Sequence, residues 1–334
     1  MNRPRSPAAM AGVSALIPNR NRVELLERVL FDLRRQTRPP EEILVIDNGS
    51  DDNSVEIARN FGARVIQMTV NTGFARAVNS GIAESRMDWV AILNNDVQLE
   101  QHWLERLHES ASQSGAWFAT GKVLRANSPE TIDGTFDLIS RGGCAWRCGE
   151  GRLDQPAFSI PREIALAPFT AAIFKKRLFD CVGLLDEQFE SYLEDVDFGL
   201  RCASQGLKGK YVPEAVAYHH GSATRGRWHP ATVRQIARNQ VFVVAKHYPK
   251  KLLIRFGWSI FVAQALWGLV ALRHGAGWAY LRGKIEGVRS FERLRTAQLP
   301  DNISGVLAES EAELHTLQQA AGFDPYWRLY FALT

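Results

Sequence analysis

Short apolar runs alternate with helical patterns in the N-terminal third of the chain, and this alternation constrains the fold more than any other feature. The runs span residues 13 to 17, 43 to 46, 64 to 68 and 89 to 93. Each has the length of a buried strand and is followed by a segment with apolar residues at helical spacing. Strands and helices joined by short connections predict an α/β fold. We expect a doubly wound, mostly parallel sheet with helices on both faces, built from right-handed crossovers.

Polar residues follow the apolar runs at the points where the predicted strands end. The fourth run stops at Asn94, Asn95 and Asp96, and Asn21 and Asp47 follow the first two. Ligands of open α/β sheets bind beyond the carboxyl ends of the strands, and an Asp held there suits Mg²⁺ or Mn²⁺. Asn and Asp also favour turns for local reasons, so an ordinary turn is the alternative interpretation.

A second acidic region lies between residues 180 and 197, where seven carboxylates occur. Glu194 and Asp195 stand where helical spacing begins, and the helix dipole favours acidic residues at that position. The dipole does not account for so many of them. A carboxylate at a helix start beside a cleft is also suited to act as a general base.

Two adjacent histidines, His219 and His220, come shortly after a predicted strand at residues 207 to 212. A single histidine is more often structural than functional. A pair at the edge of a cleft could instead ligate the same metal ion as Asp96.

The four cysteines are too few and too scattered for a disulfide framework, and no apolar signal segment follows the first residues. Residues 1 to 11 resemble a loose leader. Cys144 and Cys148 lack a second pair to complete a zinc site. We therefore expect reduced thiols in a cytoplasmic protein.

The distribution of charge is strongly asymmetric. Not one Asp or Glu occurs between Glu214 and Glu286, whereas eleven Lys and Arg do. The net charge of the whole chain is +4, so the rest of the chain has a net charge of −7. Such a gradient indicates an anionic partner: a membrane surface, nucleic acid or a phosphorylated substrate. Nucleic acid is the partner with the least support from the sequence, because no recognised nucleic-acid-binding module is found in this segment.

Residues 256 to 272 form a run of 17 residues without a charge, bounded by Arg255 and Arg273 and containing Trp258 and Trp267. Aromatic residues flanked by cations suit a helix that lies in the plane of an inner membrane leaflet. A buried core helix and a true span are the alternatives, and the run is at the lower limit of length for a span. Residues 304 to 320 predict a further amphipathic helix.

Six short motifs in a fixed order resemble the family 2 glycosyltransferases, and more narrowly the rhamnosyltransferase-like subgroup of bacterial cell-surface polysaccharide synthesis. The motifs are Ile17-Pro18-Asn19-Arg20-Asn21, Val45-Ile46-Asp47-Asn48-Gly49-Ser50-Asp51-Asp52, Asn71-Thr72-Gly73-Phe74-Ala75, Leu93-Asn94-Asn95-Asp96, Tyr192-Leu193-Glu194-Asp195-Val196-Asp197 and His219-His220-Gly221-Ser222. Each motif alone is a weak signal, but six in order are specific. The match runs from about residue 12 to 225. It implies a GT-A catalytic domain over 12–225, followed by a basic, apolar helical region over 226–334 for membrane docking or oligomerisation.

The resemblance also implies a nucleotide-sugar donor, Mg²⁺ or Mn²⁺, and inversion at the anomeric carbon. Asp47 would accept a hydrogen bond from a uracil or thymine ring, and Asp195 would be the base, with Glu194 orienting the acceptor or the base. Asp96 would hold the metal, with His219 as the second ligand because it directly follows the strand. The full set expected at the donor is Pro18, Asn19, Asn21, Asp47, Asn48, Gly73, Arg76, Asn94 and Asn95.

The chain departs from the family pattern in one respect, because the usual Asp-X-Asp is here Asn94-Asn95-Asp96. One carboxylate implies weak metal binding that the donor phosphates complete. Arg76, where relatives often carry a small residue, would instead reach a phosphate. The subgroup favours dTDP-L-rhamnose over UDP-sugars as donor, and a saccharide or lipid-linked saccharide as acceptor. The rival hypothesis is a non-catalytic protein that keeps the fold and binds sugar nucleotides or polyanions.

Overall fold

The computed structural model describes residues 12–221, 226, 228–295 and 302–334. The expected leader at 1 to 11 and Ser222 of the last motif lie outside the described residues. The four apolar runs form β1 (Val13–Asn19), β2 (Glu42–Asn48), β3 (Arg64–Met68) and β4 (Trp89–Leu93). These strands are parallel, in the order β3-β2-β1-β4.

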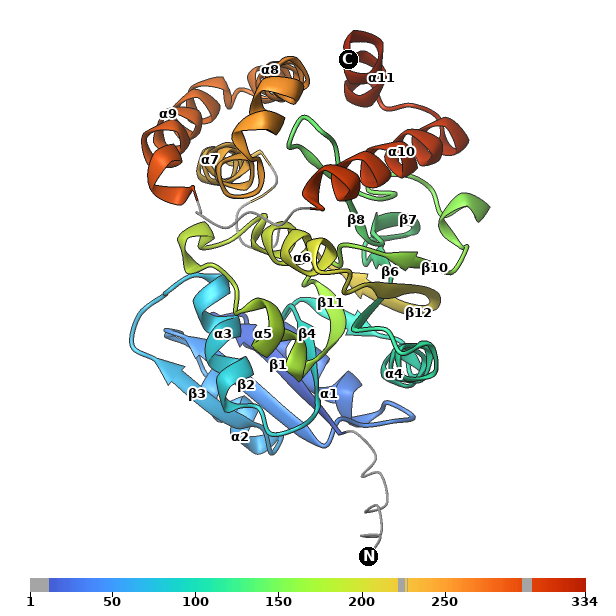
Figure 1. Ribbon diagram of the computed structural model, residues 1–334. Helices are drawn as coiled ribbons and strands as arrows, with labels where there is room; N and C mark the ends of the chain where they lie inside the picture. The colour runs from blue at the N-terminus through green and yellow to red at the C-terminus, as the bar shows by residue number, and fades with distance from the viewer. Residues whose placement is uncertain (1–11, 222–225, 227, 296–301) are drawn as a thin grey trace, which may run out of the picture.

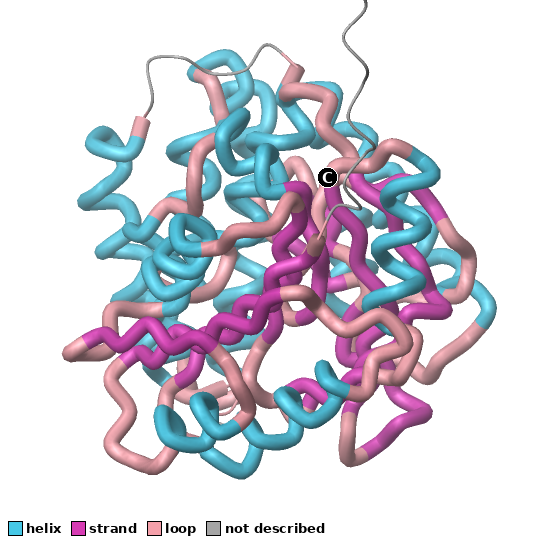
Figure 2. Tube along the Cα trace, turned by 90° about the horizontal axis from the view of Figure 1, so that it is seen from below, coloured by secondary structure: helices cyan, strands magenta, loops and turns pink. Residues whose placement is uncertain are grey.

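The sheet continues past β4 through β11 (Ala171–Lys175), β6 (Phe118–Arg125), β12 (Gly209–His219) and β10 (Arg162–Ile164). β11 is antiparallel to both neighbours, whereas β12 is parallel to β6. Two short strands, β5 (Val97–Leu99) and β7 (Ser128–Gly134), pair with β12 and β6. Figure 2 shows the strands as one twisted sheet with helices on both sides. The predicted α/β architecture, with a mostly parallel sheet, is confirmed.

The side chains of β4 show how the sheet is covered on both faces. Trp89, Ala91 and Leu93 belong to one core cluster, and Val90 and Ile92 belong to another. The first cluster includes α1 (Val23–Arg34) and α4 (Trp103–Ser114), and the second includes α3 (Phe74–Glu84), α5 (Lys176–Val182) and α6 (Glu194–Ser204). All five β4 residues are buried, as a strand between two helical layers requires.

The remaining N-terminal helix, α2 (Ser54–Asn60), packs against α1 and β3. Residues 125 to 165 contain β7, the pair β8 (Asp137–Ile139) and β9 (Ala145–Arg147), and β10. The strand predicted at 207 to 212 was too short. β12 continues to His219 through an irregularity between Val212 and Val216, which accommodates Pro213 and Glu214.

Five helices follow the sheet: α7 (Pro230–His247), α8 (Lys250–Arg273), α9 (Gly277–Leu294), α10 (Ile303–Ala321) and α11 (Pro325–Leu333). They gather at one end of the molecule, opposite β1 to β3 (Figure 1). Leu266 of α8, Leu314 of α10 and Trp327 of α11 share a core cluster with the sheet. The C-terminal helices are therefore packed onto the sheet domain.

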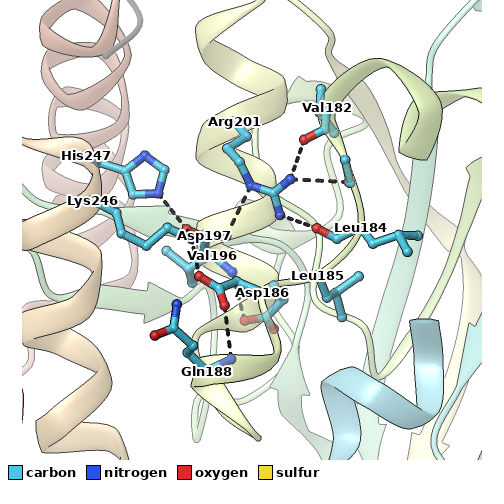
Figure 3. Close-up of polar contacts among 12 residues, drawn as sticks. Val182, Leu184, Leu185, Asp186, Gln188, Val196, Asp197, Arg201, Lys246 and His247 are labelled. Carbon is cyan, nitrogen blue, oxygen red and sulfur yellow. Dashed lines mark hydrogen bonds and ion pairs between the residues drawn. The ribbon is translucent and has the colours of Figure 1, made fainter. Parts of the chain in front are cut away.

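A buried ion cluster joins α6 to α7 (Figure 3). Asp197 of α6 has no exposed side-chain surface, and its Oδ1 lies 2.7 Å from Lys246 Nζ and 2.9 Å from His247 Nε2. Its Oδ2 accepts a hydrogen bond from Arg201 at 3.1 Å. Burial disfavours the charged form of Asp197, but Lys246, the hydrogen bond from His247 and Arg201 outweigh that effect and lower its pKa below the ordinary value. The cluster fixes α6, the helix that begins with Glu194 and Asp195.

Candidate active site

A cleft of about 540 Å³ opens at the carboxyl ends of β1, β4 and β12 and is closed from the other side by α7 and α8. Its lining brings together several predicted residues that are far apart in the sequence. Those residues are Pro18, Asn94, Asn95, Asp96, Glu194, Asp195 and His219. One cleft therefore contains both the predicted metal ligands and the predicted base.

The ends of β1, β2 and β4 are held together by side chains of the predicted donor loops. Asn95 Nδ2 donates to Asn19 Oδ1 at 2.7 Å, and the main-chain N–H of Asn21 donates to Ser50 Oγ at 2.8 Å. Asn21 has a φ of 59°, in the left-handed region that Asn tolerates better than most residues. Asp47 is 3% exposed, and its Oδ1 has no hydrogen-bond partner among the described residues. A buried carboxylate oxygen that receives no hydrogen bond from the protein is suited to accept a hydrogen bond from a ligand.

Asp96 and His219 meet at the cleft, as the sequence predicts. His219 Nε2 lies 3.1 Å from Asp96 Oδ1, and His219 Nδ1 lies 2.8 Å from Asp133 Oδ2 on β7. Burial would lower the pKa of His219, but the two carboxylates raise it to about 9. Asp133 thereby orients the ring so that Nε2 faces Asp96. An outer carboxylate of this kind commonly supports a metal-ligating histidine.

The Asp96–His219 pair fits two ligands of one divalent cation. Neighbouring ligands at about 2.1 Å from a six-coordinate ion are about 3.0 Å apart, close to the observed Nε2 to Oδ1 distance. Within the described ranges, no group of three or more His, Cys, Asp or Glu side chains is arranged to hold a metal ion. The protein would thus supply two ligands, and donor phosphates and water the others.

Glu194 and Asp195 begin α6 and are 5% and 9% exposed. Burial raises the pKa of both carboxyl groups, and for Glu194 the neighbouring Asp195 adds to the increase. Arg147 of β9 opposes the increase at Asp195, because its Nη2 lies 3.4 Å from Asp195 Oδ2. The N–H of Val196 also donates to Asp195 Oδ1 at 2.9 Å. Of the two carboxyl groups, Asp195 is therefore the one with an arginine and a main-chain N–H placed to favour its charged form.

The segment before these carboxylates has a strained backbone. Glu190, Tyr192 and Leu193 have φ values of 61°, 69° and 66°, which cost energy in residues with a side chain. Asn239 of α7 compensates by donating from its buried amide to the carbonyl oxygens of Phe189, Ser191 and Tyr192 at 2.7 to 2.9 Å. The conformation that presents Glu194 and Asp195 to the cleft is thus held by α7.

Six of the nine predicted donor residues are not part of the cleft lining: Asn19, Asn21 and Asp47, described above, and Asn48, Gly73 and Arg76. Asn48 uses its side chain within the neighbouring loop, donating to Gly73 O at 3.1 Å and accepting from the N–H of Thr72 at 2.8 Å. Gly73 has a φ of 88°, and a Cβ there would lie 3.1 Å from Glu190 O, so only glycine fits. Arg76 Nε is paired with Glu187 at 2.7 Å and would have to leave that carboxylate to reach a phosphate.

The sequence analysis missed Asp133, Asp137 and Arg147. Burial raises the pKa of Asp137 to about 7, and its Oδ1 lies 3.4 Å from Arg147 Nε. All three come from hairpins whose short strands reach the cleft only through tertiary packing. No spacing or composition in residues 131 to 148 distinguishes them from surface charges of a loop.

Comparisons with known proteins agree with this geometry. The model of Glycosyl transferase family 2 matches residues 14–183. An N-acetylglucosaminyl-diphospho-decaprenol L-rhamnosyltransferase of Mycobacterium tuberculosis is 30% identical over 226 residues, which cover 60% of this chain and 74% of that protein. The O-antigen biosynthesis protein RfbC of Myxococcus xanthus is 27% identical over 64% of this chain and 18% of its own length.

Two solved structures share the fold. GalNAc-T7 with UDP, GalNAc and Mn²⁺ has a TM-score of 0.62 at 14% identity, over 96% of this chain and 59% of that chain. The mannosyltransferase PcManGT of Pyrobaculum calidifontis, in complex with GDP-Man and Mn²⁺, has a TM-score of 0.52 at 15% identity, over 97% and 87% of the two chains. These identities support the GT-A fold alone. Since the family model spans half of the chain, from β1 to the end of α5, the protein belongs to glycosyl transferase family 2.

Proposed function

We propose that this glycosyltransferase is inverting and metal-dependent, and that it moves a sugar from a nucleoside-diphosphate donor to a hydroxyl group of a saccharide or lipid-linked acceptor in cell-surface polysaccharide synthesis. One observation carries the proposal: the Asp96–His219 pair and the Asp195–Arg147 pair lie in the same cleft. The first pair suits a cation at a diphosphate, and the second suits a base facing an acceptor.

On the donor side, Asp47 accepts the ring N–H of a uracil or thymine base through its unpartnered oxygen. Asn19, Asn21 and Pro18 form the loop beside that base, and Asn48 and Gly73 shape the next loop. Asn94 and Asn95 stand beside Asp96 at the diphosphate, and Arg76 would join them after leaving Glu187. Bound Mg²⁺ or Mn²⁺ would supply positive charge that stabilises the departing diphosphate.

In the transfer step, Asp195 removes the proton from the acceptor hydroxyl while that oxygen forms a bond to the anomeric carbon. The bond from this carbon to the donor phosphate breaks, and its electron pair leaves with the nucleoside diphosphate. Attack from the face opposite to the leaving group inverts the configuration. Glu194, whose pKa burial raises well above the ordinary value, favours the protonated form and can donate a hydrogen bond to the acceptor or to Asp195.

The similarity to an L-rhamnosyltransferase favours dTDP-L-rhamnose as donor, with UDP-sugars as the alternative, and a lipid-linked acceptor. A thermal-shift panel of nucleotide sugars with Mn²⁺ tests this, because a ligand at 100 times its Kd stabilises the folded state by roughly 2.7 kcal/mol. Asp96→Ala should lose the Mn²⁺-dependent part of the shift. A shift with a UDP-sugar and none with dTDP-L-rhamnose would show that the rhamnosyl assignment is wrong.

We also propose that the protein acts on the inner leaflet of the cell membrane, with its catalytic half in the cytosol. Among the described residues, one helix, α8, is long and apolar enough to cross a membrane. However, Phe256, Val262 and Leu266 of this helix are buried against the rest of the chain, which favours docking by the opposite face. That face and the adjoining α9 carry large apolar side chains that are more than 40% exposed. They are Ile254, Trp258, Phe261, Leu269 and Leu272 on α8, and Trp278, Leu281, Ile285 and Val288 on α9.

We call these nine side chains the apolar face. Exposed cations surround it on the same helices, among them Lys250, Lys251, Arg273 and Arg289. Each cation near anionic lipid contributes on the order of 1 kcal/mol to binding. The combination of apolar area and positive charge fits an anionic bilayer surface, where a lipid-linked acceptor would be presented.

A further inference from the structure

The wall of the cleft that faces the predicted metal ligands is built by the C-terminal helices. Thr232, Ile236 and Gln240 are spaced four residues apart on α7 and line the cleft together with Trp228 and Trp267. Side chains at this spacing lie on one face of a helix. Asp195, Asp96 and His219 line the same cleft. A ligand bound against this wall would therefore share the cleft with the proposed base.

Two polar side chains of this wall can form hydrogen bonds with a ligand. Thr232 is 4% exposed, and its Oγ1 has no hydrogen-bond partner among the described residues. Gln240 is 3% exposed, and its Oε1 accepts a hydrogen bond from Lys284 Nζ at 2.8 Å, which fixes the orientation of the amide. The amide nitrogen of Gln240 makes no hydrogen bond to the described residues and so remains available as a donor. A buried hydroxyl without a partner and a buried amide with a donor to offer favour a ligand that is rich in hydroxyl groups.

The aromatic part of the wall is held rigidly. Trp267 of α8 is in ring contact with both Trp228 and Tyr280, with ring centroids 6.3 and 5.7 Å away. Trp228 is itself stacked on His274, with centroids 4.0 Å apart and planes at 6°. Rings fixed in this way present apolar area at little entropic cost. A pyranose combines an apolar C–H face, which packs on such a ring, with hydroxyl groups at its rim.

We propose that Trp267, Thr232 and Gln240 form an acceptor subsite that binds the pyranose ring whose hydroxyl group is glycosylated. The inference rests on the proposed function, and it names the acceptor as a saccharide that is recognised by its sugar ring. The ring packs against Trp267, while Thr232 and Gln240 bond its hydroxyl groups and Asp195 receives the proton of the reacting one. Because α8 also carries part of the apolar face, a lipid attached to this sugar would lie close to the bilayer.

Binding without turnover tests the subsite. The probe is N-acetylglucosaminyl diphosphate carrying a short prenyl chain, observed by saturation-transfer NMR with the full-length protein. We expect transfer to the pyranose protons in the wild type. Trp267→Ala should weaken binding by about 10-fold or more, and Thr232→Val by about 5-fold, the size expected for one hydrogen bond. Trp267→Phe keeps an aromatic ring and should retain part of the affinity.

Matched controls separate the subsite from general damage. Thr316→Val on α10 removes an exposed threonine hydroxyl, and Trp117→Ala removes a half-buried tryptophan outside the cleft lining. Both should bind the probe as the wild type does. Binding of nucleoside diphosphate with Mn²⁺, measured in parallel, should be unchanged in every variant and reports that each has folded.

The subsite is contradicted if the wild type does not bind the probe, or if Trp267→Ala and Thr232→Val bind it with unchanged affinity. If the probe binds as expected but no nucleotide or nucleotide sugar binds, the proposed transferase function fails while the saccharide subsite stands. If the nucleotide sugar binds and the probe does not, the donor site stands and the subsite is wrong.

Discussion

The side-chain nitrogen of Asn239 lies 2.7 Å from the carbonyl oxygen of Tyr192, in a segment with left-handed backbone two residues before Glu194. The same nitrogen donates to Phe189 and Ser191. One amide in a helix of the C-terminal region therefore holds the turn that precedes Glu194 and Asp195. If Asp195 is the base, as proposed, this relationship makes Asn239 a positioning residue for it.

Replacing Asn239 should damage catalysis more than donor binding. Asn239→Ala removes the donor that holds the strained turn, so kcat should decrease by about 10-fold or more, while the donor KM changes little. Asn239→Asp has the same shape but offers only acceptor atoms to three carbonyl oxygens, and it should be at least as harmful. Steady-state kinetics measure both effects. A normal kcat in Asn239→Asp would show that the amide does not position the base.

Arg147 should influence the pH at which kcat falls on the acidic side of the pH profile. Burial raises the pKa of Asp195, and the Arg147 cation lowers it, so loss of the cation raises it further. A base must be deprotonated to act. The acidic limb of the pH profile of kcat should therefore move to higher pH in Arg147→Gln. Arg152→Gln, which alters an arginine bonded to Asp324 away from the cleft, is the control and should keep the wild-type limb. If the acidic limb of Arg147→Gln stays at the wild-type pH, Arg147 does not influence the pKa of the base.

The buried ion cluster of Asp197 should contribute strongly to the free energy of unfolding. Asp197→Asn leaves Lys246, His247 and Arg201 without their carboxylate, and breaking a buried pair costs about 3–5 kcal/mol. The cations lower the pKa of Asp197 despite its burial, so its contribution is complete above about pH 4 and is lost only as the pH falls further. Urea unfolding at pH 7, 5 and 3.5 measures this. The difference in unfolding free energy between wild type and variant should be smaller at pH 3.5 than at pH 5 and 7.

Association with anionic liposomes should depend on the apolar face. We expect the protein to sediment with such liposomes, and raised salt to weaken but not abolish sedimentation, because apolar contacts persist when charges are screened. Leu272 and Leu153 are both 65% exposed, but only Leu272 belongs to the apolar face. Leu272→Glu should reduce the bound fraction, and Leu153→Glu should not. If the wild type stays in the supernatant at low salt, the membrane proposal fails and the apolar face is better assigned to an oligomer interface.

Local patterns predicted the elements of the sheet well. β3 and β4 have the predicted bounds, because a buried strand between two helical layers is a continuous apolar run with polar ends. The strand predicted at 207 to 212 ends seven residues before β12 does, since Pro213 and Glu214 resemble a strand end and are accommodated only by an irregularity paired with β6. That pairing is not local and leaves no sign in the sequence around it.

In the candidate site too, residues at strand ends were predictable from local patterns, whereas residues brought in by tertiary packing were not. Asp96 and His219 were predicted to meet because each follows a strand, and parallel strand ends share one edge of the sheet. Arg147 and Asp133 come from hairpins of the 125–165 region, where the sequence predicts turns but not which side chains reach the cleft. The aromatic wall likewise depends on how α8 packs onto the sheet domain, which helical periodicity alone does not determine.

The release of nucleoside diphosphate by wild type and Asp195→Asn tests the central claim most directly. With dTDP-L-rhamnose or a UDP-sugar, Mn²⁺ and a lipid-linked acceptor, the wild type should release nucleoside diphosphate in step with glycoside formation. Asp195→Asn should lower kcat by about 10²-fold or more, with donor affinity nearly unchanged, as expected for loss of a general base. Normal turnover in Asp195→Asn would contradict the assigned base, and donor binding without any release by the wild type would instead support a non-catalytic sugar-nucleotide-binding protein.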